Sequence, residues 1–346
     1  MEYILSVVIP CYNCETTLEK AVNSVLNQPC ADDIEIILVD DGAKDGTPAL
    51  CDKLGEVHNN IRVVHRENGG EGPARNSGID IATGKYLAVL DSDDWWDEGV
   101  FDKSIIEMFI ENDYDIYGFS IRFISPDYKH FRIKKAPVEP QNAIGFGKLQ
   151  YSQMMHQTRC YKLGMINHFH IRYPKLKALS DIPFITKSIS VACSYKMVDK
   201  VLYNYYINLN SFYHDVDDAT IFKSGLEGNR IVDEWAKQEG LDIEIEPRAT
   251  LSGIIRFLPR YCATHTYKET LDWVSDPLFD VLNEPELLPW TRYQKSYALW
   301  KKNKKLFWLK NKILWFIPCK LKESRTKKPF IKFKNFIWYR LIKRIY

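Results

Sequence analysis

Along the first 120 residues, short apolar runs alternate with segments whose apolar positions recur at helical spacing. Residues 6–10 form a run rich in β-branched side chains, as strands do, and residues 16–27 carry apolar residues three and four positions apart, as amphipathic helices do. This alternation predicts a largely parallel sheet covered by helices on both faces. Further strands are expected over 34–39, 61–64, 86–90 and 114–119, and further helices from Gly46 onward and over 73–82.

Beyond residue 120 the pattern is less regular. A helix is expected over 180–190 and a strand rich in Tyr and Val over 196–207. The pattern from 219 to about 300 is mainly helical. We expect prolines to break these helices at Pro247, Pro259, Pro277, Pro285 and Pro289.

Polar residues follow the predicted strands where each strand ends. Pro10-Cys11-Tyr12-Asn13 follows the first, Asp40-Asp41-Gly42 the second, and Asp91-Ser92-Asp93-Asp94 the fourth, while Arg75 lies near the start of the helix over 73–82. Ligands of parallel sheets bind beyond the carboxyl ends of the strands, so these residues are expected to line one site. Any one of these motifs alone could be a turn or a helix cap. It is the ordered set that indicates a site.

The residue types suit a nucleoside diphosphate. A divalent cation held by one or two carboxylates, such as Asp91 and Asp93, neutralises two phosphates and acts as a Lewis acid on the leaving diphosphate. Arg75 can add a charge-assisted contact, and Asp41 can accept a hydrogen bond from a base imide nitrogen.

The ordered motifs resemble those of family-2 glycosyltransferases of GT-A fold. The resemblance spans about residues 4–120 and also includes Asp45-Gly46, Glu67-Asn68-Gly69-Gly70, Ala74-Arg75-Asn76-Ser77-Gly78 and Gly84-Lys85-Tyr86. It implies inverting transfer of a sugar from a nucleotide-diphosphate sugar, most often a UDP-sugar, with Mn²⁺ or Mg²⁺ as the cofactor. The implied acceptor is a lipid-linked or cell-surface glycan.

The resemblance also implies residue roles. Pro10, Tyr12, Asp40 and Asp41 would bind the nucleoside, with Asp41 at the uracil, and Arg75 would approach the base or the phosphates. Asp91 and Ser92 would contact the donor. Asp93, with Asp91, would hold the metal, and Asp181 would be the general base.

Two motifs depart from the family pattern. Ala43-Lys44 stands where Ser-Thr is usual, and Ser180 stands where a glutamate usually precedes the base Asp181. Asp181 could instead be a helix cap. His214 is a candidate third metal ligand, with a solvated loop histidine as the alternative. These departures keep open a second function, a catalytically degenerate partner subunit that binds sugar nucleotides. A nucleotidyltransferase is disfavoured because no glycine-rich phosphate loop with lysine is present.

Together these features predict a mixed, mostly parallel α/β sheet flanked by helices. The GT-A domain is expected over 1–215, with a donor-binding half over 1–120 and an acceptor half over 120–215. A helical region is expected over 216–300 and a basic amphipathic tail over 301–346.

Charge is distributed unevenly along the chain. Residues 301–346 hold sixteen Lys or Arg and one acid, Glu323, so the tail carries +15 and residues 1–300 carry −13. On a helical projection of the tail, Lys332, Arg340, Lys343 and Arg344 lie opposite an apolar face. That face holds Ile331, Trp338, Leu341, Ile342 and Ile345.

Such a helix favours an anionic membrane surface as the partner, with ordinary docking onto the protein as the alternative. No nucleic-acid partner is expected. Cys11 and Cys14 lack the second pair that would complete a zinc site. With no signal peptide or membrane-spanning run apparent, we expect a cytoplasmic protein, peripheral on the inner face of the cell membrane.

Overall fold

The structure is a computed structural model, and it describes residues 3–129, 131–135, 155–207, 218–242, 247–283, 289 and 294–319. The chain divides into two compact units. The first comprises Met1–Val216 with Ile231–Ile243, and the second comprises Asp217–Arg230 with Glu244–Tyr346. Helix α9 (Asp218–Gln238) contributes residues to both units, which the sequence pattern did not indicate.

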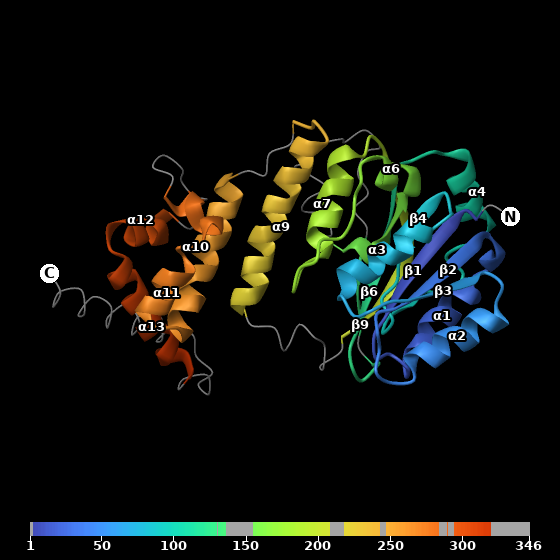
Figure 1. Ribbon diagram of the computed structural model, residues 1–346, viewed down its shortest axis with the longest axis horizontal. Coiled ribbons are helices and arrows are strands. Elements are labelled where there is room, and N and C mark those ends of the chain that lie inside the picture. Colours follow the sequence, from blue (N-terminus) through green and yellow to red (C-terminus); the bar gives the residue numbers. More distant parts are fainter. Residues whose placement is uncertain are drawn as a thin grey trace. The chain divides into compact units, whose positions relative to one another are not determined.

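The first unit is built on a mixed sheet whose amino-terminal half is parallel (Figure 1). Strand β1 pairs in parallel with β2 and β4, and β2 pairs in parallel with β3. The four strands predicted for this half are therefore confirmed. Their bounds are β1 Leu5–Cys11, β2 Ile34–Asp40, β3 Ile61–His65 and β4 Tyr86–Val89.

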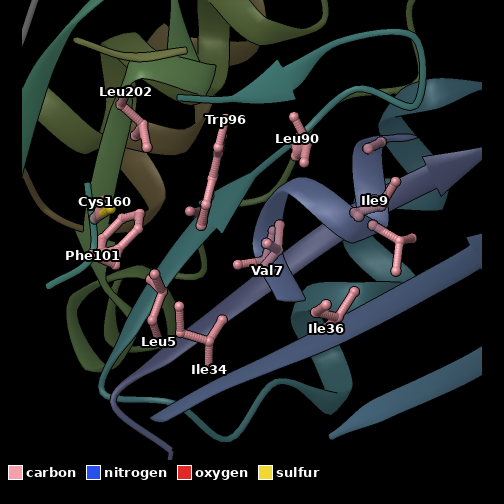
Figure 2. Close-up of a cluster of buried hydrophobic side chains, with 14 of the residues drawn as sticks. Leu5, Val7, Ile9, Ile34, Ile36, Leu90, Trp96, Phe101, Cys160 and Leu202 are labelled. Atoms are coloured by element: carbon pink, nitrogen blue, oxygen red, sulfur yellow. The ribbon is translucent and has the colours of Figure 1, made fainter. Parts of the chain in front are cut away.

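Helices cover both faces of this parallel half. Successive side chains of a strand point to opposite faces, so each face presents apolar side chains to the helices that cover it. Leu5, Val7 and Ile9 of β1 lie in a core cluster that also contains buried residues of α1 and α2. Figure 2 shows these three side chains beside Ile34 and Ile36 of β2. Helix α3 packs on the opposite face of β1 and β2, against Val8. The helices of this half are α1 Leu18–Leu26, α2 Thr47–Val57, α3 Glu71–Ile81 and α4 Lys103–Glu111.

The other half of the sheet mixes parallel and antiparallel pairs. Strand β8 pairs antiparallel with both β4 and β6, and β6 pairs in parallel with β9. Strand β5 pairs antiparallel with β9, and β7 pairs with β6. Strands β6 and β9 were expected, whereas the short strands β5, β7 and β8 were not. The bounds are β5 Trp95–Trp96, β6 Ile116–Ile124, β7 Phe131–Lys134, β8 Arg159–Lys162 and β9 Tyr195–Tyr206.

Short helices connect these strands to the core of the first unit. Phe184 of α7 is fully buried against Tyr161 of β8. Within the first unit, the end of α9 packs through Trp235, whose indole Nε1 donates a 2.7 Å hydrogen bond to the Phe169 carbonyl. The other helices that the structure describes in this unit are η1 Ala31–Asp33, η2 His156–Thr158, α6 Leu163–His168 and α7 Asp181–Val191.

The second unit is helical, as expected, and has its own core. Leu258 of α10, Phe279 of η3 and Trp300 of α12 are buried together. Pro259 lies inside α10, so the expected break at this proline is wrong. The break at Pro247 coincides with the start of α10 and that at Pro277 with the start of η3; Pro285 lies outside the described residues. The bounds are α10 Pro247–Thr264, α11 Tyr267–Trp273, η3 Pro277–Leu282, α12 Gln294–Lys302 and α13 Lys304–Cys319.

The expected basic tail begins within this helical unit. Leu306 and Phe307 of α13 are buried, and Phe307 belongs to the same core as Trp300. Trp308 Nε1 donates a 3.0 Å hydrogen bond to the His265 carbonyl. Residues 320–346, which carry the predicted amphipathic face, lie outside the described residues. Among the helices that the structure describes, none is long and apolar enough to cross a membrane.

Candidate active site

Asp91 lies just beyond the end of β4, and side chains from two other elements hold both of its carboxylate oxygens. Arg75 Nη2 donates to Oδ1 at 2.8 Å, and Gln157 Nε2 donates to Oδ2 at 2.7 Å. Burial is the largest influence on the pKa of Asp91 and raises it, but the charge of Arg75 together with smaller effects, including the hydrogen bonds from Gln157 and Arg75, outweighs burial, and the pKa is lowered. Asp91 is therefore an ionised carboxylate at neutral pH, fixed in one orientation.

Arg75 reaches Asp91 because helix α3 lies unusually close to the sheet. A Cβ on Gly78 would lie 2.4 Å from Cγ1 of Val8, so only glycine fits at this helical position without a shift. The Arg75 side chain is buried and also forms an ion pair with Glu71 at 3.2 Å. Its Nε is buried and has no hydrogen-bond partner among the described residues. A bound anion could therefore accept a further hydrogen bond from this guanidinium.

Asp94 fastens the strand-end motif to β9. Tyr203 Oη donates a 2.7 Å hydrogen bond to Asp94 Oδ2, and the Tyr206 amide donates one of 2.7 Å to Oδ1. The Tyr203 hydroxyl also accepts a 3.2 Å hydrogen bond from the Asp91 amide. Burial, followed by the charges of Asp93 and Asp91, raises the pKa of Asp94 well above its usual value. Asp94 is buried, and its hydrogen bonds with Tyr203 and Tyr206 thus hold the turn in place.

Asp93 and Ser92 lie on the turn between Asp91 and Asp94 and are half-buried. The turn is closed by a 3.1 Å hydrogen bond from the Asp94 amide to the Asp91 carbonyl. Among the described residues, no group of three or more His, Cys, Asp or Glu side chains could hold a metal ion. The described residues therefore offer no closed metal cage at this turn. Such a turn fits a hard divalent cation that takes one carboxylate from the protein and its other oxygens from substrate phosphates and water.

The expected nucleoside residues lie at the adjoining ends of β1 and β2. The Asp41 amide donates a 2.9 Å hydrogen bond to the Cys11 carbonyl, which places Asp41 beside Tyr12. Tyr12 is 49% exposed, and Pro10 is half-buried. These positions are compatible with a ligand that lies across both strand ends.

The two carboxylates after β2 have different environments. Asp41 accepts hydrogen bonds from the amides of Gly69 (3.0 Å) and Gly70 (2.7 Å) and is paired with Arg66. Asp40 accepts from the Ala43 amide at 2.9 Å and contacts His65 Nδ1 at 2.9 Å. Asp40 thus stabilises the loop after β2. Asp41 holds the 66–70 loop at the edge of the site.

Asp181 is brought to the same site by helix α7. It is the first residue of α7, whose N-cap is Ser180, and the Ser180 side chain forms no capping hydrogen bond. Burial raises the pKa of Asp181, opposed by the charge of Arg75 and reinforced by that of Asp91. Asp181 therefore lies close enough to Arg75 and Asp91 to interact with their charges. A raised pKa makes it a stronger base than an ordinary aspartate.

A chain of contacts positions α7 against α3. Asn76 of α3 exchanges two 2.8 Å hydrogen bonds with the backbone of Tyr173. The Tyr173 ring stacks on Phe184 of α7 with centroids 4.0 Å apart. Because Asn76 follows Arg75 and Phe184 lies one turn after Asp181, these contacts draw Arg75 and Asp181 toward one another.

Several residues of this site were not predicted from the sequence. Gln157 gave no signal because it lies in an irregular stretch without a motif, and Tyr173 was not singled out. Tyr203 lies in the Tyr-rich strand expected over 196–207, but its contact with Asp94 was not predicted. His156, beside Gln157, is buried with Nδ1 2.8 Å from the Tyr173 hydroxyl, and burial lowers its pKa to about 3, so it is neutral. The candidate metal ligand His214 lies outside the described residues.

Comparison with known proteins identifies the family. Residues 6–173 match the model for glycosyl transferase family 2. The chain is 30% identical over 223 residues to the uncharacterized glycosyltransferase EpsJ of Bacillus subtilis, a match that covers 60% of this chain and 62% of EpsJ. It is 37% identical over 125 residues to the minor teichoic acid biosynthesis protein GgaB of B. subtilis, which covers 35% of this chain and 14% of GgaB. The matched stretches thus span less than two thirds of these relatives' own lengths.

A solved structure shares the fold. The crystal structure of Staphylococcus aureus TarS 1–349 in complex with UDP-GlcNAc aligns with a TM-score of 0.66 at 18% identity, covering 93% of each chain. The ordered strand-end motifs, the mixed sheet and these matches agree. Residues 6–173 of the chain therefore form a domain of glycosyl transferase family 2, and the fold is GT-A.

Proposed function

We propose that this chain is an inverting, metal-dependent glycosyltransferase that moves a sugar from a UDP-sugar to a glycan or lipid-linked acceptor. The observation that carries the proposal is the grouping of Arg75, Asp91 and Asp181 at one end of the sheet. Arg75 is a buried cation and Asp91 a carboxylate held in place, and both suit donor binding. Asp181 is a carboxylate of raised pKa, which suits base catalysis. The UDP-GlcNAc bound by TarS supports a uridine nucleotide as the donor.

Asp93 is the residue we assign to the metal ion. Both oxygens of Asp91 already accept hydrogen bonds from Arg75 and Gln157, so Asp91 orients the turn and contacts the donor. Mn²⁺ or Mg²⁺ at this position would supply the positive charge that stabilises the departing diphosphate. Arg75 supplies further positive charge on the same side.

Asp181 is the residue we assign to the general base. In an inverting transfer, the acceptor hydroxyl loses its proton as its oxygen attacks the anomeric carbon, from the face opposite the diphosphate. Asp91 is occupied by Arg75 and Gln157, and Asp94 by Tyr203 and Tyr206. Asp181 lies near Asp91 but on another element, and burial raises its pKa.

The name of the relative GgaB supports a cell-surface polymer as the acceptor. We further propose that residues 320–346 bind anionic lipid at the cytoplasmic face of the membrane. The surplus of Lys and Arg in 301–346 supports this, because each basic residue near such a surface contributes about 1 kcal/mol.

A screen of UDP-sugars tests the proposal. The chain is incubated with each donor, with Mn²⁺ or with a chelator, and released UDP is measured without and with glycan acceptors. We expect metal-dependent UDP release with at least one donor and faster release with an acceptor. The alternative, a degenerate partner subunit, predicts that UDP binds in calorimetry while no donor is hydrolysed or transferred. Failure to bind any nucleotide would contradict both.

A further inference from the structure

Three aromatic side chains gather beside the site without joining the core. The Trp95 and Tyr128 rings are near parallel with centroids 6.3 Å apart, and the Tyr128 and Tyr206 rings are near parallel at 5.2 Å. Tyr128 is 60% exposed, and Trp95 and Tyr206 are half-buried. None of the three belongs to the core cluster of the sheet. We refer to Trp95, Tyr128 and Tyr206 as the aromatic cluster.

The backbone fixes the aromatic cluster next to the strand-end motif. Trp95 directly follows Asp94 and pairs with Asn204 across β5 and β9. The Tyr206 amide donates its hydrogen bond to the Asp94 carboxylate. Two of the three rings are thus attached to the same turn that carries Asp91 and Asp93. The nucleoside residues lie elsewhere, at the ends of β1 and β2.

Lys20 of α1 gives the aromatic cluster a polar group. Its ammonium lies 2.9 Å from the Trp95 ring centroid and 5.3 Å from that of Tyr128. Burial lowers the pKa of Lys20, partly opposed by the charge of Asp94. No ion pair joins Lys20 to a carboxylate within the part of the chain that the structure describes. Its N–H groups are therefore satisfied by aromatic faces and solvent, both of which a bound molecule can replace.

We propose that the aromatic cluster is the subsite that receives a pyranose ring of the acceptor, with Lys20 as a hydrogen-bond donor to that sugar. A pyranose presents a face of C–H groups and a rim of hydroxyls. The face of an aromatic ring is the negative side of its quadrupole and attracts polarised C–H groups. A few polar groups at the site then fix the orientation of the bound sugar. One exposed ring and two half-buried rings, nearly parallel between neighbours and with one ammonium beside them, match this chemistry. The inference rests on the proposed function, because it assigns the second substrate of that reaction.

Direct binding of simple sugars tests the subsite. The full chain with UDP and Mg²⁺ is titrated with methyl β-glucopyranoside, methyl β-galactopyranoside and methyl N-acetyl-β-glucosaminide by saturation-transfer NMR. Calorimetry with UDP is run on the same samples. Tyr128→Ala removes an exposed ring, and Tyr128→Phe restores it. Phe131→Ala is the matched control, since Phe131 is 66% exposed and lies outside the aromatic cluster.

We expect at least one glycoside to bind, with its ring C–H protons receiving the strongest saturation. Tyr128→Ala should raise its dissociation constant about 3- to 10-fold, as loss of one aromatic contact does. Tyr128→Phe and Phe131→Ala should bind it as the wild type does, and UDP affinity should not change in Tyr128→Ala.

Equal glycoside affinity in Tyr128→Ala and wild type overturns the inference, as does the absence of any glycoside binding while UDP still binds. A loss of UDP affinity in Tyr128→Ala would mean that the cluster stacks on the donor, which also overturns it. If the wild type fails to bind UDP, the proposed function itself fails, and this outcome is distinct from the others.

Discussion

Gln157 donates a 2.7 Å hydrogen bond to Asp91, a residue 66 positions earlier in the chain. The bond joins the segment before β8 to the motif that follows β4, and Arg75 completes the clamp from the opposite oxygen. Gln157 is buried, and its Oε1 has no partner among the described residues. Its amide is therefore held against Asp91 by the Nε2 hydrogen bond.

Replacing Gln157 should weaken donor binding. Gln157→Ala removes one hydrogen bond that orients the Asp91 carboxylate, so UDP affinity should fall by up to about tenfold. Gln157→Glu keeps the shape but puts a second carboxylate beside Asp91, and it should bind UDP more weakly still. Calorimetric titration with UDP and Mg²⁺ measures both. Wild-type affinity in Gln157→Glu would show that the clamp has no role in binding.

The metal assignment predicts a selective effect of Asp93. Asp93→Ala should abolish the difference in UDP-sugar affinity between samples with Mn²⁺ and samples with chelator, because the turn then lacks the assigned ligand. Glu98→Gln is the matched control, since Glu98 is an exposed carboxylate a few residues away. It should retain full metal dependence. Persistent metal dependence in Asp93→Ala would transfer the assignment to another residue.

The general-base assignment predicts a change in both rate and pH profile. Asp181→Asn should lower transfer to the acceptor by about 10²–10⁴-fold and leave UDP affinity nearly unchanged. The base acts only when deprotonated, so wild-type kcat/KM should fall as the pH drops through the pKa of Asp181. Since burial raises that pKa above 3.8, the fall should begin at a higher pH than for an ordinary aspartate. Asp181→Asn should lose this acidic limb, and an unchanged limb would assign it to another group.

Gly78 predicts a stability effect that a matched glycine should not share. A Cβ at Gly78 would lie 2.4 Å and 2.9 Å from the two Cγ atoms of Val8, so Gly78→Ala should destabilise the fold by about 1–3 kcal/mol. Gly164→Ala is the control, because a Cβ at Gly164 meets nothing within 4 Å. Thermal unfolding measures both, and adding Val8→Ala should recover part of the stability lost in Gly78→Ala. Equal melting temperatures for Gly78→Ala and Gly164→Ala would contradict the close approach of α3.

Two truncations separate membrane binding from folding. Deleting 320–346 should leave the thermal stability unchanged and abolish sedimentation with anionic liposomes. Wild-type sedimentation should weaken as salt screens the charges. Deleting 301–346 should in addition destabilise the helical unit, because it removes the buried Phe307. Liposome binding by the chain without 320–346 would refute the tail as the anchor.

Local pattern determined a large part of this protein. Strands β1 to β4 and the helices between them were predicted correctly because their apolar periodicity is carried by neighbouring residues. The same alternation placed Tyr12, Asp41 and Asp91 at one edge of the sheet, since parallel strands end on the same side. The sequence alone also singled out Asp93 and Asp181, through motifs that resemble the family's.

Only the tertiary structure decided how these residues are supported. Strand β8 has four residues and β5 has two, too few to show a period, and their pairing with β4 and β9 is non-local. Gln157 and Tyr173 therefore gave no signal, and the contact of Tyr203 was not predicted, although these residues orient Asp91, α7 and Asp94. The sequence pattern also failed at Pro259, where a helix break was expected. Helix α10 continues past this proline, and its neighbours Leu258 and Cys262 are buried in the core of the helical unit. Periodicity is a property of consecutive residues, whereas the hydrogen bonds from Gln157 to Asp91 and from Tyr203 to Asp94 join residues 66 and 109 positions apart, and only folding brings them together.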